Sequence, residues 1–139
     1  MSGPLVWRAL LAGAGFNVAI SLLMSFGSGF LFGLVGMSWF AALGFALRVV
    51  SALADIGSGA IAGHIANRDG PLHGALASLI ASLVMLPVSW GRVWLATSNI
   101  SFAFDAGYWI DFGLWTAVGL VLAGIAGFIA VELRRARGA

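Results

Sequence analysis

Arg48 and Asp55 are the residues of this chain whose types are best suited to chemistry. They are the only charged residues between Arg8 and His64, in a stretch that is otherwise apolar and rich in glycine. An arginine or an aspartate costs about 2.5–3.5 kcal/mol at the centre of a membrane-spanning helix. Ionisable side chains in such a helix therefore need polar partners or a functional reason to be there.

Two interpretations of this pair are open. A spacing of seven residues places both side chains on one face of a helix, ~10 Å apart along its axis. In the first interpretation, neighbouring helices satisfy both charges and the contacts fix how the helices align, or the Arg48 side chain extends outward to the membrane surface. In the second, Asp55 titrates in a proton or ion pathway, or belongs to a polar substrate site. The lack of a second deep carboxylate counts against a relay.

Composition indicates that lipid is the solvent for much of the chain. The 139 residues are 61% hydrophobic and 9% charged, whereas a water-soluble domain carries about 25% charged residues. A chain this short cannot bury so much apolar surface in its own core. Cysteine and lysine are absent, which excludes disulfides and Schiff-base cofactors, and no basic stripe fits nucleic acid. We predict one integral domain of the cell membrane, residues 1–139.

Four segments are long and apolar enough to cross a bilayer, which takes about 20 residues each. The sequence thus predicts an all-α transmembrane four-helix bundle with spans at residues 6–30, 39–66, 72–95 and 109–133. A polar turn with glycine and proline at 67–71 joins the second and third spans as a hairpin. The glycine-rich connection at 27–38 is either a loop or a re-entrant segment.

Arginine placement predicts the orientation of these spans. Five arginines fall on one side of the predicted bundle and only Arg92 marks the other; the five are Arg8, Arg68, Arg134, Arg135 and Arg137. Because positive charge is retained in cytoplasmic loops, both termini are expected in the cytoplasm.

The depth of each polar residue predicts its partners. Counted from the cytoplasmic ends, Asp55, Asn17 and Ser82 all lie ~16 Å deep, and Arg48 lies ~27 Å deep. We therefore predict one polar layer of Asp55 with Asn17 and Ser82. A second layer is predicted to contain Arg48, Ser25, Ser89 and Thr116.

Small residues recur at every fourth position and predict where the helices touch. Close packing of such residues drives helix association in lipid. The predicted packing positions are Gly13, Gly29, Gly33, Gly59, Gly63, Gly119, Ala123 and Gly127. These ridges either build the bundle alone, or one of them faces another protomer or a partner subunit.

His64 and His73 flank the predicted turn, and both are expected at the cytoplasmic surface. Facing histidines can ligate a haem or a metal, and a single one can ligate a chlorophyll. No attachment motif, carboxylate partner or third ligand accompanies them. We therefore expect neither a metal nor a cofactor.

The same hairpin resembles a known element. The segment Ser-Gly-Ala-Ile-Ala-Gly-His at 58–64, followed by Gly-Pro-Leu-His-Gly-Ala at 70–75, resembles the helix-two/helix-three hairpin of small four-helix prokaryotic integral membrane proteins of unknown function. Pro71 stands where that family has a bulky aromatic residue. The resemblance implies the four-helix layout and a cytoplasmic turn, and it implies no activity.

No catalytic constellation or phosphate-binding loop occurs in the sequence, so we do not expect an enzyme. The expected role is that of a structural or accessory subunit of a membrane complex, or of a self-associating scaffold. The alternative is a small oligomeric channel or transporter that uses Asp55 and Arg48. Either role predicts a homo-oligomer or a larger membrane complex.

Overall fold

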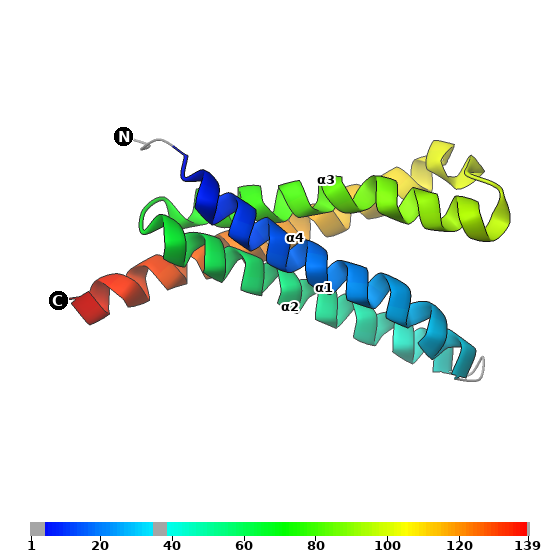
Figure 1. Ribbon diagram of the computed structural model, residues 1–139, viewed down its shortest axis with the longest axis horizontal. Helices are drawn as coiled ribbons and strands as arrows, with labels where there is room; N and C mark the ends of the chain where they lie inside the picture. The colour runs from blue at the N-terminus through cyan, green and yellow to red at the C-terminus, as the bar shows by residue number, and fades with distance from the viewer. Residues whose placement is uncertain (1–4, 35–38, 139) are drawn as a thin grey trace.

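The structure, a computed structural model, describes residues 5–34 and 39–138. Its elements in chain order are α1 (Trp7–Leu34), α2 (Phe40–Ala66), α3 (Gly70–Thr97), the short 3-10 helix η2 (Ser101–Phe104) and α4 (Ala106–Gly138), as Figure 1 shows. All four α-helices are long and apolar enough to cross a membrane. The predicted all-helical fold with four such helices is confirmed.

The connections follow from local sequence. Residues 27–34 continue α1, so this part of the predicted loop or re-entrant segment is helical, and residues 35–38 lie outside the described residues. The turn between α2 and α3 is as tight as predicted. Asn67 and Asp69 adopt left-handed backbone conformations, with φ of 55° and 45°, which these two residue types tolerate. Pro71 lies in the first turn of α3, where a missing N–H breaks no helical bond.

The helices pack together at one end and diverge at the other (Figure 1). Both chain ends and the α2–α3 turn lie at the packed end, which we call the closed end (residues 7–17, 54–81 and 119–138). Beyond it, α1 stays beside α2 and α3 stays beside α4, forming two arms (residues 18–34 with 40–53, and residues 82–118). Within the described part of the chain, Ala103 is the only buried residue outside the closed end.

Small residues allow the backbones of the closed end to touch. A Cβ atom added to Gly59 would lie 2.6 Å from the carbonyl carbon of Ala123, and one added to Gly63 would lie 2.6 Å from the Cα of Gly127. Such distances leave room for hydrogen only, so α2 and α4 cross with their backbones in contact. The largest fully buried side chains are correspondingly few and small: Leu10, His73, Ser58 and Ser78.

The divergence of the arms decides which predicted packing positions are used. Six of the eight are buried at the closed end: Gly13, Gly59, Gly63, Gly119, Ala123 and Gly127. Gly29 and Gly33 are not, and the prediction for these two is wrong within this chain. A Cβ on Gly29 would come no nearer than 3.9 Å to Arg92, and one on Gly33 would meet no described neighbour within 4 Å. Both lie on an arm that has separated from the opposite helices.

Candidate polar site between the arms

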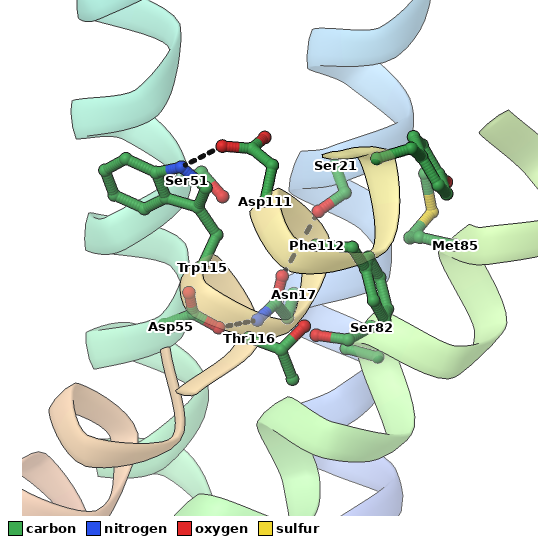
Figure 2. Close-up of a pocket in the computed structure, with 12 residues that line it drawn as sticks. Asn17, Ser21, Ser51, Asp55, Ser82, Met85, Asp111, Phe112, Trp115 and Thr116 are labelled. Carbon is green, nitrogen blue, oxygen red and sulfur yellow. Dashed lines mark hydrogen bonds between the residues drawn. The ribbon is translucent and has the colours of Figure 1, made fainter. Parts of the chain in front are cut away.

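Asp55 lies where the closed end meets the arms, and two neutral side chains hold its carboxylate. Figure 2 shows one of them, Asn17. The Asp55 Oδ1 accepts hydrogen bonds from Asn17 Nδ2 at 2.7 Å and from Ser78 Oγ at 2.6 Å. The Ser21 hydroxyl donates to Asn17 Oδ1 at 3.2 Å. This last contact turns the amide so that its NH₂ group faces the carboxylate.

The fourth helix makes room for the same carboxylate. A Cβ on Gly119 of α4 would lie 2.7 Å from Asp55 Oδ2. Glycine at this position therefore lets the carboxylate rest against the α4 backbone. In the described chain the structure gives Asp55 no arginine or histidine partner, so its charge is hydrogen-bonded but not neutralised.

A cavity of about 290 Å³ opens beside Asp55 between the two arms. All four helices contribute to its lining, and most of the lining side chains are polar (Figure 2). The polar members beyond the Asp55 network are Ser51, Ser82, Tyr108, Asp111 and Thr116. The cavity is large enough for several water molecules or a small hydrated ion.

Arg48 pairs with Asp111 rather than with Asp55. Its Nη2 lies 3.8 Å from Asp111 Oδ2, and its guanidinium lies 4.5 Å from the centre of the Trp115 ring. Trp115 also donates its Nε1–H to Asp111 Oδ1 at 3.2 Å, which Figure 2 shows. The Arg48 and Asp111 side chains stay 51% and 61% exposed. This group joins α2 to α4 across the gap between the arms.

Arg92 makes a second bridge between the arms. Arg48 extends from the α1–α2 arm, whereas Arg92 extends from the α3–α4 arm. It extends from α3 to α1, where it donates to the Ser25 hydroxyl and lies 5.5 Å from the centre of the Phe26 ring. Each arm thus contributes one arginine that contacts the other arm. Both bridges lie beyond the closed end, where backbone contact no longer holds the helices together.

The structure corrects parts of the predicted polar layers. Asn17 contacts Asp55, but Ser78 supplies the hydroxyl expected from Ser82, which instead lines the cavity. The predicted Arg48 layer is wrong, because none of its three other members is placed with Arg48. Ser25 accepts from Arg92, Ser89 donates to the Leu86 carbonyl at 2.8 Å, and Thr116 lines the Asp55 cavity. Depth counting assumes parallel helices, and the arms diverge.

Asp111 is the functional candidate that sequence reasoning missed. It lies near the start of the predicted span 109–133, yet it lines the same cavity as Asp55. The cavity beside Asp55 therefore has a second carboxylate in its lining. The signal available in the sequence was the spacing of four between Asp111 and Trp115, which places both on one helix face. In the structure this face contacts Arg48.

His73 is fully buried, so its predicted surface position is wrong. Its Nε2 accepts a hydrogen bond from the Val6 N–H at 3.0 Å, and its Nδ1 lies 3.0 Å from the Asp69 carbonyl, to which it donates. Both ring nitrogens are engaged, which leaves no lone pair for haem, chlorophyll or metal. His73 thereby ties the start of α1 to the start of α3.

His64 is exposed, as predicted, and its carbonyl accepts a hydrogen bond from Arg134. Among the residues that the structure describes, no group of three or more histidine, aspartate or glutamate side chains could hold a metal ion.

No protein-family model, curated protein or solved structure matches this chain. The resemblance of the α2–α3 hairpin to small four-helix membrane proteins stays a prediction.

Proposed function

We propose that this chain is a multi-pass membrane carrier for a proton or a small cation, with Asp55 as the binding group. The observation that supports this proposal is the Asp55 carboxylate, held by neutral donors beside a polar cavity. A carboxylate without a countercharge inside a membrane-spanning bundle attracts a cation or a proton, because an isolated charge at membrane depth is costly. A second carboxylate, Asp111, lines the same cavity.

The shape of the bundle favours a carrier over an open pore. The Asp55 cavity is lined mainly by residues of the arms, while at the closed end the backbones at Gly59, Gly63 and Gly127 touch. A binding group that backbone contact encloses toward one end of the bundle fits a carrier better than an open pore. The arginines at the closed end favour a cytoplasmic location for that end and for both termini.

Proton and cation flux in liposomes tests the proposal. We expect Asp55→Asn to abolish flux while the fold persists, since an asparagine oxygen can still accept from Asn17 and Ser78. Asp105→Asn is the matched control, because Asp105 lies in the exposed loop before α4 and only caps the Gly107 N–H. Flux through Asp55→Asn at the wild-type rate would show that Asp55 is not the binding group. Lack of any proton or cation flux through the folded wild-type protein would refute the carrier itself.

A self-associating scaffold is the second candidate, and the exposed Arg48–Asp111 pair favours it. Half-exposed charges within membrane-spanning helices are costly when lipid surrounds them. Each copy presents one base and one acid on the same face. A two-fold axis therefore brings Arg48 of each copy against Asp111 of the other, as in a self-complementary interface.

Charge reversal in trans tests this second candidate. Arg48→Asp places two acidic groups at positions 48 and 111 of one chain, and Asp111→Arg places two basic groups there. Each variant alone should fail to self-associate. When the two are co-expressed with different tags, every contact between copies joins opposite charges, so they should co-purify. If the pair acts only within one chain, mixing restores nothing, and this outcome would contradict self-association through the pair.

A further inference from the structure

A groove at the closed end combines an apolar floor with a basic rim. It lies between the last turns of α2 and α4 and encloses about 500 Å³. Aliphatic side chains form its floor, chiefly Ile61, Ile65 and Leu133, and the rim carries Arg134, Arg137 and His64. The groove shares no lining residue with the Asp55 cavity.

Hydrogen bonding fixes part of this rim. The Arg134 Nη1 donates to the His64 carbonyl at 2.6 Å, in the last turn of α2, where helix carbonyls lack partners of their own. One guanidinium has five N–H donors, so most of those of Arg134 remain available. Arg135 differs, because Glu132 neutralises it at 2.6 Å. In the described part of the chain, neither Arg134 nor Arg137 forms an ion pair with a carboxylate.

We propose that this groove binds an anionic phospholipid, with one acyl chain on the aliphatic floor and the phosphate between Arg134 and Arg137. This lipid site rests on the membrane insertion proposed above and is independent of any transport at Asp55. Apolar surface next to unpaired guanidinium groups matches the two halves of such a lipid, and basic pockets between helices on the cytoplasmic side bind anionic headgroups. Arginine also binds phosphate through paired N–H donors.

Lipid titration of the purified full-length protein in detergent, followed by native mass spectrometry, tests the proposal. Phosphatidylglycerol is expected to bind the wild type more tightly than phosphatidylcholine. Each arginine near an anionic headgroup strengthens binding by about fivefold, so Arg134→Gln with Arg137→Gln should weaken it by roughly 25-fold. Arg8→Gln with Arg135→Gln removes the same charge at the same end but outside the groove, and should leave binding unchanged. Asp55→Asn should also leave it unchanged.

Three outcomes would overturn the proposal. Equal weakening in both double variants would mean general charge attraction. Equal binding of phosphatidylcholine would mean that the guanidinium groups do not select an anionic headgroup. Binding of soluble glycerol phosphate as tightly as of the whole lipid would mean a small-anion site that does not use the floor. Thermal unfolding without lipid checks that the variants fold, and Arg137→Gln alone, which keeps the Arg134–His64 bond, is measured if the double variant is unstable.

Discussion

Gly59→Ala tests whether backbone contact holds the closed end together. The added methyl group would lie 2.6 Å from the Ala123 carbonyl carbon, about 0.8 Å short of the 3.4 Å at which ordinary contact begins. Because the obstacle is backbone, no side-chain rotation relieves it, and α2 and α4 must separate. A gap of 0.5–1 Å already removes about a quarter to a half of each dispersion contact along the seam. We expect destabilisation of about 3 kcal/mol, at the upper end of the range for overpacking.

Gly15→Ala is the matched control, since a Cβ there meets no described neighbour within 4 Å. This substitution should be neutral or should stabilise by up to about 1 kcal/mol, because alanine is the better helix former. Unfolding of both variants in mixed micelles with increasing dodecyl sulfate, followed by circular dichroism, measures the difference. If Gly59→Ala unfolds at the same sulfate concentration as Gly15→Ala, close backbone packing does not stabilise this bundle.

Two further predictions concern the buried polar groups of the closed end. His73→Ala leaves the Val6 N–H without its acceptor and should destabilise the fold by about 1–3 kcal/mol, measured by the same unfolding assay; hydrogen exchange at Val6 as slow as in the wild type would contradict this role. Ser58→Ala should stabilise by about 1 kcal/mol, because the fully buried Ser58 hydroxyl has no hydrogen-bond partner within the described structure. A loss of stability in Ser58→Ala would show that its hydroxyl has a partner, such as an internal water.

The fold was predictable because it depends on patterns that repeat along the chain. Four apolar runs predict four helices, and the polar turn after Ala66 predicts where α2 ends. The contact between Asn17 and Asp55 was predictable from depth because both lie near the closed end, where the helices are packed and depths correspond. The same counting fails for Arg48, since the arms diverge there and its partner, Asp111, comes from a different level of α4.

The position of His73 was not predictable from its place beside a turn. A histidine near a polar turn reads as interfacial, and nothing local indicates that the Val6 N–H, 67 residues away along the chain, needs an acceptor there. Gly29 and Gly33 show the converse limit. Their spacing matches that of the packed glycines, but spacing identifies only the face of a helix and not whether a partner helix lies against it.

The scarcity of large side chains at the closed end has a consequence for how this protein can vary. Glycine and alanine lose no rotamer freedom on packing. The closed end therefore packs without the side-chain entropy cost that leucine- or methionine-rich interiors carry. The same small residues make the closed end intolerant of substitution, since most replacements add a larger side chain against the backbone of a neighbouring helix. The outward-facing arm residues carry no such restriction. Tolerance of substitution should therefore rise along each helix from the closed end to the far ends of the arms. The arms can then vary in sequence while the closed end stays nearly constant.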